Sequence, residues 1–322
     1  MKIAILGKIH SDGLEFLRSK NLEVLEINTF EENELISLIS DVEGIIIRTA
    51  NLNENLLSKC KNLKIVARHG VGYDNIDLNY LNKKNIALAI TGQSNAVSVA
   101  EHVMTMMLTL SKNIFASDSL TRSNGFEFKA ELPDFFELYQ KKILILGFGR
   151  IGQALAKRCL GFEMEVMVYD PYLDNKIIST SGCSPVNLTE GFKIADYISI
   201  HLPLNNETKN LISDEEFKLF KKNLILINTA RGGIVNEDAM YKALRSKQIY
   251  AAGIDVFEKE PPPKNHQLFK LENIILTPHN SALTLECRKR MSLEACMNVF
   301  NFLQNINDLN KKNIVNLNNL NF

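Results

Sequence analysis

A glycine-rich string in the middle of the chain has the composition of a pyrophosphate-binding turn. It follows the apolar run KILIL, precedes a helix-compatible stretch, and consists of Gly147, Phe148, Gly149, Arg150, Ile151 and Gly152. In a strand–turn–helix unit of this kind, the first glycine permits the tight turn and the second lets backbone approach the phosphates, while the third lets helix and strand pack closely. The free N–H groups and the dipole at the start of the helix would then stabilise the phosphate charge.

An acidic residue indicates which nucleotide this turn binds. The next apolar run, EVMVYD, ends at Asp170, 18 residues after Gly152. A carboxylate in this place binds the ribose 2′-hydroxyl of a dinucleotide and would repel a 2′-phosphate. The order of strand, glycine turn, helix, strand and acid therefore predicts NAD rather than NADP as the cofactor.

Two of the six histidines could act as a general acid and base. His279 follows a strand-like run in ILTPHNS, and His201 follows another in ISIHLPL. Catalytic groups of open α/β sheets lie beyond the carboxyl ends of strands, and a histidine there can exchange a proton near neutral pH when a carboxylate partners it. The other four fall in a helical pattern or in loops, where a histidine is more often a structural or surface residue: His102, His10, His69 and His266.

Hydride transfer between NAD and a carbonyl compound would also require a cation for the substrate's carbonyl or for a carboxylate beside it, and a partner for the histidine. Arg231 in LINTARGGIVNE and Glu260 in GIDVFEKEPP are the candidates, because each follows a β-type run. Taken by itself, Arg231 could equally be a solvated turn residue, and Glu260 could be one of several surface acids.

The elements that must position these residues alternate along most of the chain. Short runs rich in Ile, Val and Leu, without strict alternation, are typical of strands buried on both faces. Strands separated by helix-compatible stretches imply parallel sheets with right-handed connections. The predicted strands span residues 2–6, 22–27, 44–47, 63–67, 86–89, 142–146, 165–170, 197–202, 224–228, 251–256 and 274–277, with a last edge strand at 314–317.

One long helix is predicted between the two strand series, at residues 94–117, where apolar residues recur at helical spacing. A loop follows at 121–140, and a helix at 283–303 precedes an Asn-rich tail at 305–322. Because the second series has its own nucleotide motif, we predict two doubly wound parallel-sheet α/β domains. A Rossmann NAD domain at 97–281 is inserted into a flavodoxin-like substrate domain made of residues 1–96 and 282–322.

Composition excludes several classes of function. The 322 residues include 37 Lys plus Arg and 37 Asp plus Glu, so net charge gives no reason to expect nucleic acid or an anionic membrane as a partner. No signal peptide or membrane helix is predicted, since the apolar runs are too short. Five scattered cysteines without CxxC spacing indicate reduced thiols of a cytoplasmic protein, and no metal site is expected.

Taken together, the motifs resemble those of the D-isomer-specific 2-hydroxyacid dehydrogenases, a family that includes phosphoglycerate dehydrogenases and hydroxypyruvate and glyoxylate reductases. The similarity extends over nearly the whole chain. Its strings are RHGVGYDNID (68–77), SVAEH (98–102), GFGRIG (147–152), YDPY (169–172), HLPLNNETKNLI (201–212), NTARGGIVNEDAM (228–240), AGIDVFEKEP (252–261) and LTPHNSALT (276–284).

The resemblance implies a catalytic role for three residues and a D-2-hydroxy acid, with its 2-keto acid, as the small-molecule partner. Arg231 would bind the substrate, His279 would exchange the proton, and Glu260 would pair with His279 and favour its protonated form. The substrate contacts implied by the resemblance are Arg48, Thr49, Val71 and Gly72.

The resemblance also implies the remaining cofactor contacts. Arg150 and Ile151 would cover the pyrophosphate, Pro203 and Thr208 would flank the adenine and phosphate side, and Asp255 would hold the nicotinamide carboxamide. Thr229 and Ala230 would lie along the cofactor. Members are usually homodimers built through the cofactor domain, so a homodimer is expected.

The sequence departs from the family pattern after His279, where Asn280-Ser281-Ala282 replaces the common Ile-Gly-Gly, and at Phe126, where relatives often have Trp. An NADH-sensing corepressor-like binding protein keeps the same motifs and stays open as an alternative. A formate-type dehydrogenase is disfavoured, because that branch has Gln at the position of Glu260.

Overall fold

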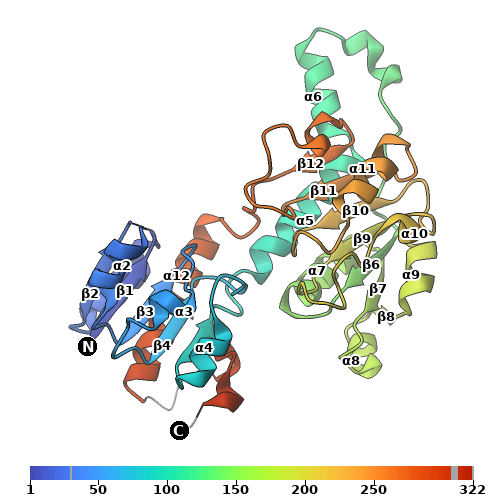
Figure 1. The fold of residues 1–322 in the computed structure, drawn as a ribbon. Coiled ribbons are helices and arrows are strands. Elements are labelled where there is room, and N and C mark those ends of the chain that lie inside the picture. The colour runs from blue at the N-terminus through green and yellow to red at the C-terminus, as the bar shows by residue number, and fades with distance from the viewer. Residues whose placement is uncertain (30, 306–310, 321–322) are drawn as a thin grey trace. The chain divides into compact units, whose positions relative to one another are not determined.

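The computed structural model describes residues 1–29, 31–305 and 311–320. Contacts divide the chain into two compact units (Figure 1). The split unit consists of Met1–Asn95 and Leu283–Phe322, and the central unit of Ala96–Ala282. The sequence-based domain boundaries fall after residues 96 and 281.

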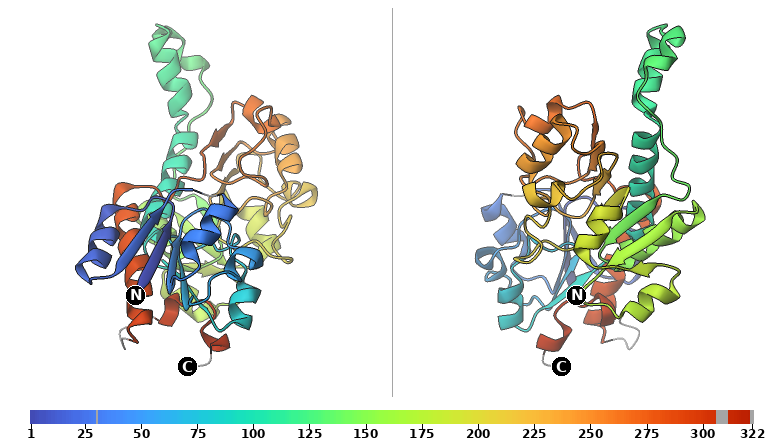
Figure 2. Two further views of the ribbon diagram at one scale, coloured as in Figure 1. Left: turned by 60° about the vertical axis from the view of Figure 1, so that its left-hand side comes forward. Right: turned by 90° about the vertical axis from the view of Figure 1, so that its right-hand side faces the viewer.

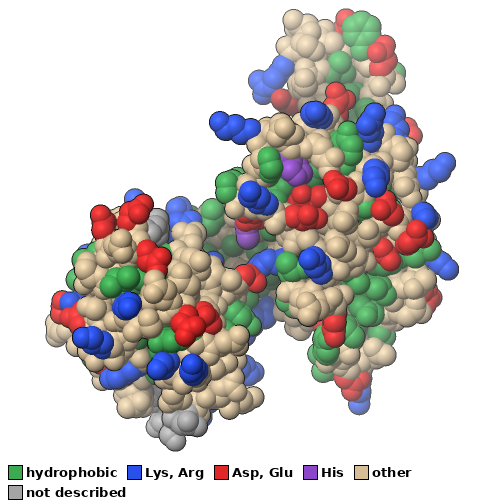
Figure 3. Space-filling view, viewed as in Figure 1, with side chains coloured by type: hydrophobic (Ala, Val, Ile, Leu, Met, Phe, Trp, Pro, Cys, Tyr) green, Lys and Arg blue, Asp and Glu red, His purple; other side chains and the backbone are tan. Residues whose placement is uncertain are grey.

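Basic and acidic side chains are interspersed over the face that Figure 3 shows.

The split unit is built on a parallel sheet of five strands in the order β2-β1-β3-β4-β5. This is the flavodoxin-like order, in which the connections change direction between β1 and β3. The strands are β1 (Lys2–Leu6), β2 (Glu23–Ile27), β3 (Gly44–Ile47), β4 (Ile65–Arg68) and β5 (Ala87–Ile90).

Helices cover both faces of this sheet (Figure 2). On one face, α1 (Ser11–Ser19) packs against α12 (Leu285–Leu303), and their apolar side chains share a core with Ile3 and Ile46. The other face is covered by α2 (Glu32–Ile39), α3 (Glu54–Leu57) and α4 (Leu78–Lys83). Burial on both faces explains why these strands are continuous apolar runs.

The central unit has seven parallel strands in the order β12-β11-β10-β9-β6-β7-β8. From β6 onward this is the Rossmann order, whose switch point lies between β6 and β9. The strands are β6 (Lys142–Leu146), β7 (Glu165–Tyr169), β8 (Ser184–Pro185), β9 (Tyr197–Ile200), β10 (Ile225–Asn228), β11 (Ala251–Ile254) and β12 (Ile274–Leu276).

One face of this second sheet is covered by α5 (Ala96–Ser111) and α7 (Arg150–Gly161), and the other by α9 (Leu188–Ile194), α10 (Asp214–Phe217) and α11 (Glu237–Arg245). The short helix α8 (Asn175–Thr180) precedes β8. The predicted fold class, two doubly wound parallel sheets with the Rossmann unit inserted, is confirmed.

The prediction of one long helix at 94–117 is wrong. Helix α5 ends at Ser111, and α6 (Ile114–Arg122) begins after Asn113, whose φ of 45° is left-handed. The Asn113 amide donates to the Tyr250 hydroxyl at 2.8 Å and to the Asp134 carbonyl at 3.2 Å, which fixes this break. Helix α6 and the 3-10 helix Phe126–Glu131 extend from the rest of the central unit (Figures 1 and 2).

The predicted edge strand at 314–317 is also wrong. Ile314 forms only an isolated antiparallel bridge with Ala89, and a 3-10 helix follows at Leu317–Asn319. The side chain of Asn316 forms hydrogen bonds to β5 and to the residue before it: its amide oxygen accepts from Leu88 N–H at 2.8 Å, and its amide nitrogen donates to the Ile86 carbonyl at 2.9 Å.

Residues 306–310 and 321–322 of the predicted tail lie outside the described residues. Within the described part of the chain, no helix is both long and apolar enough to cross a membrane.

Candidate active site

The three proposed catalytic residues follow three neighbouring strands of the central sheet. Arg231 lies after β10, Glu260 after β11 and His279 after β12, and these strands are adjacent and parallel. The carboxyl ends of parallel strands meet at one edge of a sheet, which is where open α/β folds bind ligands. The topology therefore brings the loops of all three residues to the same edge.

His279 and Glu260 form a direct pair. The His279 Nδ1 lies 2.8 Å from Glu260 Oε2, and the two side chains are 47% and 38% exposed. The other Glu260 oxygen accepts from Phe257 N–H at 3.1 Å, which orients the carboxylate. A carboxylate at Nδ1 leaves Nε2 of the imidazole as the atom that can exchange a proton with a substrate.

A buried carboxylate fixes the loop on which His279 sits. Asp255 is fully buried, and it accepts from Thr277 Oγ1 at 2.5 Å and from the backbone N–H groups of Asn280 and Ser281 at 2.9 and 3.0 Å. These three partners flank His279, whose own φ of 52° is left-handed. Asp255 thus positions the histidine. Its sequence-based contact with the nicotinamide stays a prediction.

Arg231 lies in a loop that packs against the segment before Glu260. A Cβ on Gly232 would lie 1.9 Å from the Phe257 carbonyl oxygen, so only glycine permits this approach. The Arg231 carbonyl accepts from the Asn228 amide at 2.9 Å, and its guanidinium donates to the Ala230 carbonyl at 2.7 Å. The guanidinium is half-buried, and its loop is held beside that of Glu260.

The glycine turn has the geometry that a pyrophosphate requires. Gly147 has a φ of 91°, and a Cβ on Gly152 would lie 2.2 Å from the Gly147 carbonyl oxygen. Gly149 is the N-cap of α7, and nothing lies within 4 Å of its Cβ position. Backbone at the start of a 12-residue helix is therefore open to a ligand, as phosphate binding at a helix N-terminus demands. Arg150 and Ile151 form the first turn of that helix.

Asp170 lies against this turn. Its Oδ2 accepts from Phe148 N–H at 2.8 Å, and its Oδ1 accepts from Tyr172 N–H at 3.0 Å. The carboxylate follows β7, the strand next to β6, so it lies where the adenosine ribose of a dinucleotide on this turn would be.

The other predicted cofactor contacts follow β9 and β10. Thr208 organises the loop after β9, because its hydroxyl donates to the Pro203 carbonyl at 2.6 Å. Thr229 is 6% exposed, and its buried Oγ1 has no hydrogen-bond partner within the described residues. Ala230 N–H donates to Asn228 Oδ1 at 3.0 Å. The orphaned hydroxyl and the open glycine cradle both fit a dinucleotide such as NAD.

The predicted substrate contacts lie in the split unit. Arg48 and Thr49 follow β3, and Val71 and Gly72 follow β4. Arg68 fixes the second loop, because its guanidinium donates to the carbonyls of Gly72 and His69 at 2.8 and 2.6 Å. Val71 and Gly72 are partly exposed, so their backbone is accessible to a substrate.

Comparisons with known proteins relate this chain to one enzyme family. The model of the D-isomer-specific 2-hydroxyacid dehydrogenase NAD-binding domain matches residues 104–281. The chain is 37% identical over 285 residues to the hydroxypyruvate reductase of Thermotoga maritima, covering 87% of this chain and 92% of that one. The chain belongs to the D-isomer-specific 2-hydroxyacid dehydrogenase family. The predicted family and the NAD cofactor are thereby confirmed.

Two further relatives show how far the likeness to this family extends. The chain is 33% identical to the D-3-phosphoglycerate dehydrogenase of Archaeoglobus fulgidus over 98% of its own length, but it spans only 59% of that relative. A solved D-lactate dehydrogenase of Aquifex aeolicus, complexed with NAD and lactic acid, has a TM-score of 0.85 and 30% identity, covering 97% of this chain and 98% of that one.

The remaining histidines of this family member have other environments. Burial around His201 lowers its pKa to about 3, which keeps the ring neutral. His102 lies 3.2 Å from Thr277 Oγ1, and His266 lies 3.0 Å from Glu237. Both contacts brace loops at the edge of the central sheet. His10 accepts from Asp12 N–H at 3.3 Å and caps α1.

The burial of His69 differs from the prediction made from the sequence. It lies in a loop, as expected, but it is only 5% exposed, so the interpretation as a surface residue is wrong. No pattern in the sequence distinguishes it, because its burial comes from the packing of the β4 loop in the split unit.

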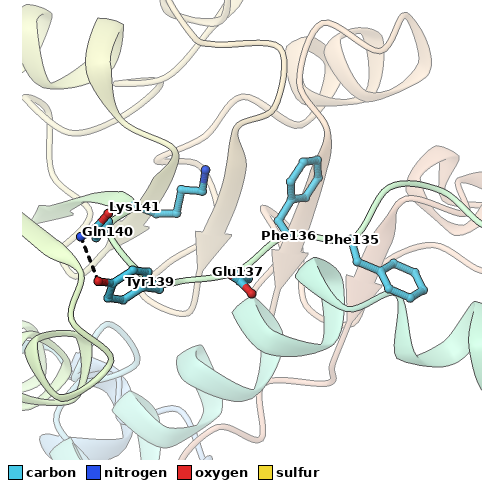
Figure 4. Close-up of a pocket in the computed structure, with 6 residues that line it drawn as sticks. All are labelled: Phe135, Phe136, Glu137, Tyr139, Gln140 and Lys141. Atoms are coloured by element: carbon cyan, nitrogen blue, oxygen red, sulfur yellow. Dashed lines mark hydrogen bonds between the residues drawn. The ribbon is translucent and has the colours of Figure 1, made fainter.

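The five cysteines and one surface hollow contribute no residue to the site described above. All five cysteines are buried free thiols, and burial raises the pKa of Cys159 and of Cys296 to about 12. The described residues contain no cluster of His, Cys, Asp and Glu able to hold a metal ion. The hollow, about 590 Å³, is lined by Phe135, Phe136, Glu137, Tyr139, Gln140 and Lys141 (Figure 4).

Proposed function

We propose that the protein interconverts a small D-2-hydroxy acid and its 2-keto acid with NAD as the redox partner. The observation that carries this proposal is the 2.8 Å contact between His279 and Glu260, at the sheet edge that the Arg231 loop also reaches. A proton-exchanging group, its carboxylate and a cation are what the reaction requires of the protein.

The residues divide the reaction between them. His279 donates its Nε2 proton to the carbonyl oxygen during reduction and takes it back during oxidation, while Glu260 stabilises the imidazolium form. Arg231 polarises the carbonyl and binds the carboxylate, since a guanidinium can do both through its fork of donors. NAD, when bound, supplies hydride transfer at the 2-carbon.

The remaining contacts follow from the same proposal. Arg48 and Thr49, with the backbone N–H groups of Val71 and Gly72, bind the substrate. Arg150 and Ile151 cover the pyrophosphate, Asp170 binds the ribose, and Pro203 and Thr208 lie on the adenine side. Thr229, Ala230 and Asp255 lie along the nicotinamide half. The relatives named above are dehydrogenases and a reductase, so they give no support to the NADH-sensing alternative.

A cytoplasmic homodimer is the proposed form of the protein. The extension formed by α6 and the 3-10 helix exposes Phe115 and Phe126 by 67% and 68%, and no residue of α6 is buried. Exposed aromatic side chains on one projecting segment are typical of a surface that a second chain covers. Light scattering of the purified protein measures the mass.

A panel of 2-keto acids, each incubated with NADH and with NADPH, tests the activity by the loss of nicotinamide absorbance. We expect reduction of at least one small 2-keto acid, with a preference for NADH. The His279→Ala variant serves as the blank for each substrate. No NADH consumption above that blank with any member of the panel would contradict the proposal.

A further inference from the structure

A cavity of about 220 Å³ lies at the carboxyl edge of the sheet in the split unit. It lies where the loops after β1, β3 and β4 meet the first turn of α12, and its lining residues are Lys8, Ile9, His10, Ser11, Arg48, His69 and Arg288. This is the switch point between β1 and β3, the position at which a doubly wound sheet binds ligands. Its volume suits one small group rather than a whole cofactor.

The cavity gathers positive charge that the protein does not neutralise. Lys8, Arg48 and Arg288 all line it, and none of them forms an ion pair with a carboxylate within the described residues. Asp12, which follows the lining residue Ser11 in the chain, lies 2.8 Å from His10. Three cationic side chains that line one small space repel each other, and an anion bound between them would offset this repulsion.

A buried side chain of the same cavity has an unused polar atom. His69 is 95% buried, and its Nε2 has no hydrogen-bond partner in the described part of the chain. Burial, with Arg48 and Arg68 acting in the same direction, lowers the pKa of His69 to about 4, so the ring is neutral at neutral pH. A neutral imidazole with a free Nε2–H can donate to an anionic oxygen, and a buried polar atom without a partner is costly otherwise.

Residues that line the cavity are also, or are close in sequence to, the residues proposed to bind the substrate. Arg48 belongs to both sets, and His69 precedes Val71 and Gly72 on the loop that Arg68 fixes. A substrate whose carboxylate lies on the Val71–Gly72 backbone would thus have a cationic cavity beside it.

We propose that this cavity binds a second anionic group of the substrate, a phosphate or a carboxylate, through Lys8, Arg48, His69 and Arg288. The substrate is then a 2-hydroxy acid with a charged distal end rather than lactate or glycerate. This inference rests on the proposed dehydrogenase function, and it makes Lys8 and Arg288 determinants of specificity.

Paired substrates test this specificity in the full-length protein with NADH. Phosphohydroxypyruvate is compared with hydroxypyruvate, and oxaloacetate with pyruvate, which separates a phosphate from a carboxylate. We expect wild-type kcat/KM to favour one charged member by at least tenfold. In Arg288→Gln and Lys8→Gln that ratio should fall by about tenfold, the effect of one charge-assisted hydrogen bond. Lys289→Gln, an exposed neighbour outside the cavity, should keep the wild-type ratio.

Direct binding separates the failure of this inference from the failure of the proposed function. Inorganic phosphate and malonate should raise the melting temperature of the wild type, and should do so less in Arg288→Gln. Stabilisation of this kind without turnover of any 2-keto acid would leave the anion site standing and reject the dehydrogenase function. The inference would be overturned if the wild type reduced substrates without a charged distal end equally well. It would also be overturned if Arg288→Gln kept the wild-type ratio of kcat/KM between the paired substrates.

Discussion

Among the individual residues, Asp255 shows best what the sequence could not predict about the candidate site. The sequence places it inside the predicted strand 251–256, and the resemblance assigned it only to the cofactor. In the structure its two oxygens bind Thr277, Asn280 and Ser281, which flank His279. Those partners are distant along the chain and meet Asp255 only because β11 and β12 pair. The motifs predicted the candidate catalytic residues, whereas they did not predict the hydrogen bonds that orient the His279 loop.

Asp170 determines the choice between NAD and NADP in our account. In Asp170→Asn the charge that repels a 2′-phosphate is removed, while an oxygen remains to accept from the Phe148 or Tyr172 N–H. We expect the ratio of kcat/KM with NADH to that with NADPH to fall by about tenfold or more, because a charged hydrogen bond to the ribose is lost. Initial rates with both cofactors measure this ratio.

Glu165→Gln is the matched control for this change, since it removes a carboxylate from the exposed start of the same strand. That variant should keep the wild-type ratio. An Asp170→Asn protein that prefers NADH as strongly as the wild type would show that Asp170 does not read the ribose.

Burial of His69 makes stability depend on pH in a defined direction. Its pKa of about 4 in the folded state lies below the ordinary 6.5, so the unfolded chain binds more protons between these values and stability falls as pH falls through this window. Between pH 7 and pH 5 this residue should cost about 2 kcal/mol of unfolding free energy. Urea titrations at both pH values measure it.

The His69→Asn variant lacks the titrating ring and should lose correspondingly less stability over the same interval. Burial of His201 acts in the same direction and remains in both proteins, so it cancels in the comparison. Identical pH dependence in the wild type and the variant would refute the neutral, buried state of His69.

On the scale of elements, two glycines of the same turn should respond differently to an added methyl group. In Gly152→Ala the Cβ would meet the Gly147 carbonyl at 2.2 Å, so folding is destabilised by about 1–3 kcal/mol. In Gly149→Ala the Cβ meets nothing within 4 Å, so stability is retained, yet it occupies the space that the phosphates need. We expect NADH affinity of Gly149→Ala to fall by about tenfold or more.

Thermal melts and fluorescence titration with NADH check these two outcomes on the same samples. A Gly149→Ala protein that binds NADH as tightly as the wild type would contradict the assignment of this turn to the pyrophosphate.

The strands were predictable because apolar runs buried on both faces stand out in the sequence, and their parallel pairing was predictable from the alternation with helices. The long helix and the edge strand were predicted wrongly because, at these places, side chains form hydrogen bonds with groups elsewhere in the fold. Asn113 ends α5 by adopting a left-handed conformation and binding Tyr250, although nothing in the apolar pattern stops there. Asn316 supplies through its amide the hydrogen bonds that an edge strand would have made. These side-chain hydrogen bonds depend on partners that are distant in the sequence, so the local pattern does not predict them.

At the scale of the whole molecule, the central unit is one continuous segment, Ala96–Ala282, with its own sheet and its own core. A segment of this kind can fold by itself when few contacts depend on the rest of the chain. We expect a fragment of residues 96–282 to fold and to bind NADH within tenfold of the full-length affinity, without reducing any 2-keto acid. Circular dichroism, NADH titration and rate measurements would show this, and turnover by the fragment would contradict the proposed role of Arg48, Val71 and Gly72.

The central claim is that the imidazole of His279, oriented by Glu260, exchanges the proton of a dehydrogenase reaction. Its most direct test is the turnover of His279→Gln on the best 2-keto acid of the panel, together with the NADH dissociation constant of the same protein. We predict that kcat falls by about a hundredfold or more, as loss of a general acid demands, while the dissociation constant changes by less than about threefold. Wild-type turnover in His279→Gln, or an equal loss of turnover and NADH binding, would contradict the account.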